Sequence, residues 1–332
     1  GSYDGAISNS GTFIYSSTTD QVLSGIISGD GALTKQEDSS LTLSGANTYT
    51  GATLISAGVL RAQNDTALGT TASGTTVASG AALELNDLDD GTAIAIGAEA
   101  LSLAGTGISN GGALRNIAGN NSYAGAITLT ADTRINSDSG TLTLDVASGA
   151  AITGTFNLTF GGAGNITVSD AITTGTGTLT KDGTGTLTLA GNNSYTGTTS
   201  ITNGIVAITH ANALGKNGET LSATTVSSGA TLSISNGIDV PEPVTISGTG
   251  YTTVGVIRFT GGANTYSGAI TLAANSTISS TGSGGTTFSG TINATSSGVQ
   301  SLTITTTTDN FTIAGAIGGT TRPSTVDISA IG

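Results

Sequence analysis

The chain contains no cysteine, methionine or tryptophan, and it has one histidine and three prolines among 332 residues. Without cysteine it can form neither a disulfide framework nor a thiolate metal site. Eight lysines and arginines stand against 21 acidic residues, so the formal net charge is −13. A nucleic-acid surface needs clustered positive charge, which excludes nucleic acid as a partner and disfavours binding to an anionic membrane surface.

Long hydrophobic runs are also missing. The longest apolar stretches are far too short to span a bilayer, so we expect no membrane insertion by this chain. The absence of methionine leaves no initiator, and we expect a processed product or a fragment. Charged residues make up only 9% of the chain, and chains rich in Gly, Ser and Thr are commonly disordered. Here apolar residues alternate regularly, so we expect a folded chain.

A tandem repeat is the strongest feature that is present. The stretch from Leu41 to Thr53 returns with few changes from Leu187 to Thr199. A Tyr-x-Gly motif marks each unit, at Tyr3 and Gly5, Tyr49 and Gly51, Tyr123 and Gly125, Tyr195 and Gly197, and Tyr266 and Gly268, and the last four tyrosines are separated by 74, 72 and 71 positions. Such repeats indicate stacked units. We therefore expect residues 1–332 to form a single domain built from units of about 72 residues.

Within each unit the hydrophobic period is two. Apolar residues alternate with Thr or Ser, as in Leu142-Thr-Leu144 and Leu187-Thr-Leu189, which is typical of half-buried strands. Gly, Asn and Asp at short intervals supply the turns. The segments from Asn64 to Gly69 and from His210 to Gly215 are expected to form one helical turn at most, so the pattern predicts an all-β fold.

The repeat length distinguishes between three all-β architectures: a sandwich, a propeller and a parallel β-helix. A sandwich does not explain near-identical copies so far apart, and a propeller blade usually takes about 40–50 residues. A parallel β-helix with coils of about 20–25 residues fits, because three coils fill one unit. We predict an elongated parallel β-helix, a β-solenoid, whose alternate apolar residues point into one continuous interior. About 15 coils at the spacing of β-strands give a length on the order of 70 Å.

One longer pattern recurs over most of the chain. It covers Ser40 to Leu60, Ala67-Leu68-Gly69 and Thr76 to Leu83, and it returns at Gly185 to Val206, Ala213-Leu214-Gly215 and Thr225 to Leu232. This pattern resembles the passenger-associated transport repeat of bacterial autotransporters. The resemblance implies a secreted, right-handed parallel β-helix displayed at the surface of a bacterial cell.

Residues able to carry chemistry are few, and most are copied between repeats. His210 has Asn64 as its equivalent in the sister copy, so we expect an exposed turn residue in place of a catalytic base. Lys35 matches Lys181 and Arg115 matches Arg258, which indicates architecture. The remaining arginines are scattered along the sequence: Arg61, Arg134 and Arg322.

The most charged local stretch carries Asp87, Asp89 and Asp90, which makes it a weak candidate for a calcium loop. It lacks the distal Glu and the spacing of such a loop, so a solvated turn is favoured. We assign no catalytic residue, no metal and no cofactor. The recurrent tyrosines are candidate stacking platforms for sugars, although capping turns or covering coil corners is the favoured role.

These observations predict a non-enzymatic extracellular structural protein of a bacterial surface, a rod that associates end to end into fibres or matrix. The first alternative is an autotransporter adhesin passenger that binds a glycan or another ligand on a host or neighbouring cell. The second alternative is a β-helix carbohydrate-active enzyme, which requires an unmatched pair of carboxylates in a groove.

Overall fold

The structure is a computed structural model that describes residues 1–87, 92–216, 223–307 and 311–330. Over these residues it is all-β, and its only helical elements are two single 3₁₀ turns, Ile108–Asn110 and Tyr251–Thr253. The strands pair in parallel, with partners about one coil apart in sequence. The prediction of a parallel β-solenoid is thereby confirmed.

The chain divides into two compact units, each longer than one repeat: unit 1 is Gly1–Thr174 and unit 2 is Gly175–Gly332. The expectation of one domain over the whole chain stays a prediction. No helix in the described ranges is both long and apolar enough to cross a membrane.

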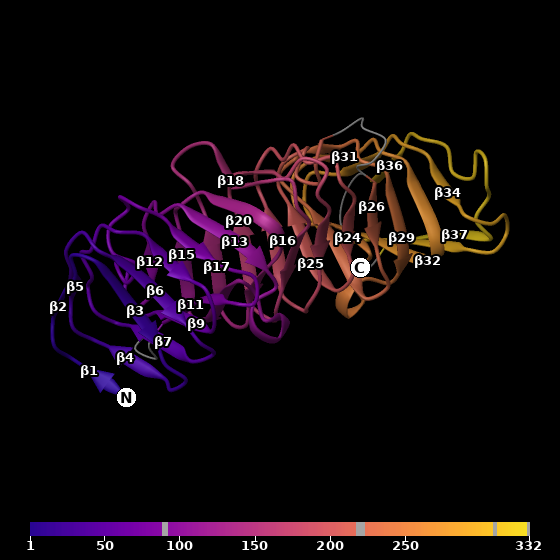
Figure 1. The fold of residues 1–332 in the computed structure, drawn as a ribbon. Coiled ribbons are helices and arrows are strands. Elements are labelled where there is room, and N and C mark those ends of the chain that lie inside the picture. The colour runs from indigo at the N-terminus through magenta and orange to yellow at the C-terminus, as the bar shows by residue number, and fades with distance from the viewer. Residues whose placement is uncertain (88–91, 217–222, 308–310, 331–332) are drawn as a thin grey trace. The chain divides into compact units, whose positions relative to one another are not determined.

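Unit 1 is a stack of short strands joined by turns (Figure 1). Its strands are β1 (Ser2–Tyr3), β2 (Ile7–Ser8), β3 (Thr12–Ser16), β4 (Gln21–Leu23), β5 (Ile27–Ser28), β6 (Ala32–Gln36), β7 (Ser40–Leu43), β8 (Thr53–Ile55), β9 (Val59–Ala62), β10 (Thr75–Val77), β11 (Ala82–Asn86), β12 (Ala95–Ile96), β13 (Leu101–Gly105), β14 (Leu114–Ala118), β15 (Asn120–Tyr123), β16 (Ile127–Ser137), β17 (Thr141–Leu144), β18 (Ala150–Thr153), β19 (Leu158–Gly161), β20 (Asn165–Val168) and β21 (Ala171–Thr173).

Unit 2 repeats the arrangement. Its strands are β22 (Leu179–Lys181), β23 (Thr186–Leu189), β24 (Thr199–Ile201), β25 (Gly204–Ile208), β26 (Thr224–Val226), β27 (Ala230–Ile234), β28 (Asp239–Val240), β29 (Val244–Gly248), β30 (Ile257–Phe259), β31 (Asn264–Tyr266), β32 (Ile270–Ser280), β33 (Thr286–Phe288), β34 (Ile292–Ala294), β35 (Ser301–Thr306), β36 (Phe311–Ile313) and β37 (Thr325–Ala330).

The register explains why apolar residues alternate with Thr and Ser. Val77 of β10 lies opposite Ile55 of β8 and Leu103 of β13, and all three side chains are buried. The intervening residue Thr76 lies opposite Ser102 and faces outward. Since successive side chains of a strand point to opposite faces, in-register stacking lines up the apolar residues in an interior column.

The glycines of the Tyr-x-Gly motif allow adjacent coils to approach closely. A Cβ at Gly51 would collide with the backbone of Gly31, and a Cβ at Gly197 would collide with the backbone of Gly177. Each of these contacts joins a coil to the preceding coil of the same unit. Only glycine tolerates such an approach, which gives these marks of the repeat a steric cause.

The copies of the motif at Gly125 and Gly268 have a different neighbour at the same place. A Cβ at Gly125 would collide with the backbone carbonyl of Glu99, and a Cβ at Gly268 would collide with that of Glu242. Glycine is therefore required at all four positions. The residue that faces the motif glycine is a glycine at Gly51 and Gly197 and a glutamate at Gly125 and Gly268.

Candidate functional site

Four of the five motif tyrosines lie inside the coils, whereas Tyr3 is 49% exposed. Tyr49, Tyr123, Tyr195 and Tyr266 are each 0% exposed. Burial raises the pKa of all four phenols. A ring without accessible surface cannot stack on a sugar in this conformation, so these tyrosines contribute to the interior of the fold and do not cover its corners.

The glycines two residues further on are packing positions as well. Gly125 and Gly268 are buried against the backbone of the preceding coil, as is Gly197, whereas Gly51 is half-buried. A buried glycine offers a ligand no side chain and little surface. The structure thus places these glycines between coils.

The hydroxyl groups of the tyrosines have different surroundings. The hydroxyl of Tyr49 lies 2.7 Å from Thr53 Oγ1, and the hydroxyl of Tyr195 lies 2.8 Å from Thr199 Oγ1. The hydroxyl of Tyr266 donates to the carbonyl oxygen of Glu242 at 2.8 Å. Among the described residues, the buried hydroxyl of Tyr123 has no hydrogen-bond partner. The repeat therefore keeps the ring at every copy and varies the polar contact.

The matched lysines are buried and hold coil corners. Lys35 Nζ donates to the carbonyl oxygens of Gln36 and Glu37, both at 2.6 Å, and to that of Ala57 at 3.3 Å. Burial lowers the pKa of Lys35, although nearby carboxylates, Asp38 foremost, oppose this effect. Lys181 Nζ makes the same pattern of bonds to the carbonyls of Asp182, Gly183 and Asn203. These lysines satisfy backbone groups that face the interior.

His210 and its counterpart Asn64 share one structural role. Nδ1 of His210 accepts the backbone N–H of Asn212 at 3.0 Å, and Oδ1 of Asn64 accepts the backbone N–H of Thr66 at 3.0 Å. Each side chain thereby closes a turn two residues ahead. His210 is half-buried, less exposed than the sequence suggested. The two segments form hydrogen-bonded turns, with Ala67 N bonded to Asn64 O in the first copy.

An ion-pair ladder runs along one face of unit 1. Glu84 on β11 accepts from Arg61 on β9 at 2.8 Å and from Arg115 on β14 at 3.2 Å. Arg115 also pairs with Asp138, and the hydrogen bond to that carboxylate is the main cause of the raised pKa of Arg115. Arg61, which looked scattered in the sequence, thus belongs to a network. Arg258 stands at the matching place in unit 2, where its strand neighbours are Ser233 and Ser279.

The acidic stretch is only partly described. The side chain of Asp87 lies against Gly119, whereas Asp89 and Asp90 lie outside the described residues. Within the described ranges, no group of three or more His, Cys, Asp or Glu side chains is placed to hold a metal ion. The weak calcium-loop candidate stays a prediction.

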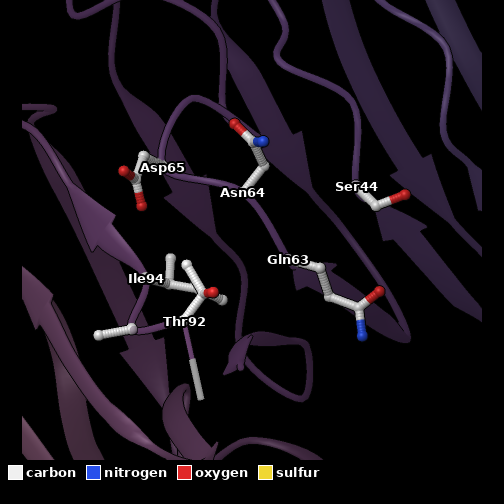
Figure 2. A pocket seen from close by; sticks show the side chains of 7 residues that line it. Ser44, Gln63, Asn64, Asp65, Thr92 and Ile94 are labelled. Carbon is white, nitrogen blue, oxygen red and sulfur yellow. The ribbon is translucent and has the colours of Figure 1, made fainter. Parts of the chain in front are cut away.

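Two neighbouring hollows occur in unit 1, and Asp65 lines both. The first has a volume of about 280 Å³, and Figure 2 shows Asn64 and Asp65 on one segment and Thr92 and Ile94 on another. Asp65 fixes this edge, because its Oδ1 accepts the backbone N–H of Ala95 at 2.8 Å. Its counterpart in unit 2 is Ala211, so Asp65 breaks the repeat.

The second hollow, of about 320 Å³, contains a buried carboxyl group that sequence reasoning missed. Glu99 is 3% exposed, and its Oε1 accepts the hydroxyl of Thr75 at 2.7 Å. Burial raises the pKa of Glu99 to about 7, and the Thr75 hydrogen bond opposes this shift. Glu242 is the copy in unit 2 and is also fully buried. The available signal was the shared position, since each Glu precedes its Tyr-x-Gly tyrosine by 24 residues.

Comparison with known proteins places the repeat in a family. The family model of the passenger-associated-transport-repeat matches residues 33–62 and 179–208. These ranges contain the buried lysines, Tyr49, Tyr195 and the strands around them. A search of curated proteins and a search of solved structures returned no match.

The fold and the repeat define the class of protein: an all-β solenoid whose coils carry a recurring Tyr-x-Gly signature. Together with the two family matches, this makes the chain similar to the β-helical passenger domains of autotransporters. The family implies secretion to the cell surface, and the repeat is not an enzymatic family in itself.

Proposed function

We propose that this passenger β-helix is a non-enzymatic structural protein outside a bacterial cell, and that its copies associate end to end into fibres or matrix. The proposal is carried by one observation: the inward-facing apolar side chains are incompletely covered on β3 in unit 1 and on β37 in unit 2.

At the edge of unit 1, the inward-facing side chains of β3 are only partly covered. Phe13 and Tyr15 lie opposite Leu33 and Lys35 of β6. The latter pair is completely buried, whereas Phe13 and Tyr15 are half-buried. The register is therefore continuous between β3 and β6, and the inward side chains of β3 are less covered than those of β6.

The edge of unit 2 shows the same feature more strongly. Val326 and Ile328 of β37 lie opposite Leu302 and Ile304 of β35. Their exposed fractions are 42% and 53%, against 0% for both partners on β35. An added strand in register would bury these side chains and would pair the open backbone edge.

A second copy of the chain has the required complement, because its own β3 carries aromatic side chains on the inward face. Pairing of β37 with β3 of the next copy uses two different surfaces, and such a contact propagates instead of closing. The net charge of −13 keeps filaments apart laterally at low salt, since like charges repel over about 10 Å or more at these ionic strengths.

The test is sedimentation velocity and electron microscopy of the intact chain over a range of concentrations. We expect concentration-dependent growth in the wild type and its loss in Ile328→Asp. Thr325→Asp is the matched control, because it adds the same charge to the same strand at a side chain that pairs with half-buried Ser301. A wild type that stays monomeric at high concentration, or equal behaviour of both variants, would refute end-to-end association.

The adhesin alternative has its own support. Asp65 is exposed, lines both hollows and replaces the Ala211 of the sister copy. A residue that departs from the repeat is where a ligand surface is expected. Asp65→Ala restores the sister residue, so loss of cell or glycan binding in this variant would favour adhesion. The carbohydrate-active enzyme has weaker support, because it requires two carboxylates that the repeat does not copy. Asp65 has no copy in unit 2, whereas Glu99 is matched by Glu242.

A further inference from the structure

We propose that the second hollow of unit 1 binds a small organic cation, with an alkylammonium group placed against the carboxylate of Glu99. This inference is independent of end-to-end assembly and concerns other residues.

The hollow exists because a turn replaces a strand. β12 pairs with β15 on one side. On its other side lies the turn from Asn64 to Gly69, which bonds within itself through Gly69 N and Thr66 O at 2.9 Å. The coil wall is therefore interrupted between this turn and the segment that leads from β12 to Glu99. The resulting space is at the lower end of the usual range for ligand pockets, about 300–1,000 Å³.

The floor of the hollow carries a buried acid. Glu99 is 3% exposed, and its carboxyl group accepts a hydrogen bond from a neutral hydroxyl, that of Thr75. Among the described residues, no lysine, arginine or histidine lines the hollow. A buried carboxylate is costly unless it is paired, so a cation that enters this space gains from the charge that the fold leaves uncompensated.

The walls favour an organic cation over a bare metal ion. Leu68 and Ile96 provide apolar surface, and Thr66 and Thr70 add hydroxyl groups. The described residues offer no group of three or more acidic or imidazole donors for a metal ion. An alkylammonium ion fits both the carboxylate of Glu99 and the apolar wall of the hollow. Its alkyl chain covers the apolar wall while its N–H groups donate to the carboxylate.

Groups that titrate near Glu99 constrain the pH profile. The tyrosines that interact with it are Tyr49 and Tyr123, and burial raises the pKa of both phenols, so they stay neutral. Asp65 stands at the rim. Burial raises the pKa of Glu99 to about 7, and therefore the ionised form that attracts a cation predominates above pH 7.

The experiment is an amide-resolved NMR titration of the intact protein with butylammonium chloride, with 1-butanol and with potassium chloride as comparison probes. We expect saturable shifts at residues 66–71 and 96–99 with butylammonium, and weaker or no shifts with the other two probes. Affinity should rise about tenfold from pH 6 to pH 8, since the ionised fraction of a group with a pKa near 7 rises by about that factor.

Glu99→Gln should lose at least about tenfold in affinity at pH 8, because it removes the charge and keeps the shape. Glu242→Gln is the matched control, and it should leave the shifts at residues 66–71 unchanged. Equal binding of butanol, no pH dependence, or an unaffected Glu99→Gln variant would each overturn the proposal. If Glu99→Gln fails to fold, the probe comparison and the wild-type pH profile still decide it.

Discussion

The four equivalent tyrosines provide a sharp test of the structure, because the same Tyr→Phe substitution removes a different contact at each copy. In unit 1, Tyr49→Phe removes the 2.7 Å contact to Thr53 Oγ1 and leaves that buried hydroxyl without its partner. Loss of one hydrogen bond together with a stranded buried group costs about 1–2 kcal/mol. Tyr123→Phe removes a buried hydroxyl that has no partner among the described residues, so its effect should be near zero or slightly stabilising.

Unit 2 supplies an intermediate case. Tyr195→Phe removes a 2.8 Å contact to Thr199 Oγ1, but that hydroxyl also donates to the carbonyl oxygen of Leu214 at 3.3 Å. The stranded-group penalty is therefore smaller, and we expect a loss of about 0.5–1.5 kcal/mol.

The assay is urea denaturation followed by circular dichroism, with the midpoint compared at constant m-value. Tyr49→Phe and Tyr123→Phe lie in the same unit, so differences between units do not enter their comparison. If Tyr123→Phe lowers the midpoint as much as Tyr49→Phe, the polar contacts of the interior are assigned wrongly.

Four further substitutions test other parts of the structure. Leu189→Asp places a charge in the buried column and should lower the free energy of unfolding by more than about 4 kcal/mol, whereas Thr188→Ser should lower it by under about 0.5 kcal/mol. Equal losses of stability in thermal melts would contradict the assignment of the inward and outward faces. Folded Glu99 keeps a proton that the unfolded chain loses above pH 4.5, so the free energy of unfolding should fall by up to about 3 kcal/mol as the pH rises from 4.5 to 7, and Glu99→Gln should remove this slope in urea titrations. His210→Asn should leave the free energy of unfolding from urea titration unchanged within about 0.5 kcal/mol, since Asn64 already makes the same turn. A loss above about 1 kcal/mol would show that the imidazole stabilises the fold by more than this turn contact.

Much of the fold could be predicted because the same packing requirement selects the same residue type in every copy of the repeat. The alternation around Leu187 and Leu189 reports which face of the strand is buried, and the glycines after the tyrosines report where coils come close. The interior position of the tyrosines was not predicted. An aromatic ring with a polar end is equally suited to a corner or to a core, and only the closed coil decides between them.

The ion-pair ladder and the hollow were beyond sequence reasoning for a different reason. Arg61 and Glu84 are 23 positions apart, a separation that becomes a contact only once the register of the coils is known. The burial of Glu99 could not be predicted, because a single acidic residue beside a strand usually lies in solvent. Its burial depends on the neighbouring coils on both sides, including the close approach of Gly125 to its backbone, which local patterns do not encode.

The pairing of each strand with the next coil also has a kinetic meaning. In unit 1, β8 finds β10 about 22 residues later, and β10 finds β13 about 26 residues later. Closing loops of this size is fast and carries a modest entropy cost that does not grow as further coils are added. A segment can therefore acquire its native partners as soon as roughly one coil has followed it, so the chain can fold progressively from one coil to the next.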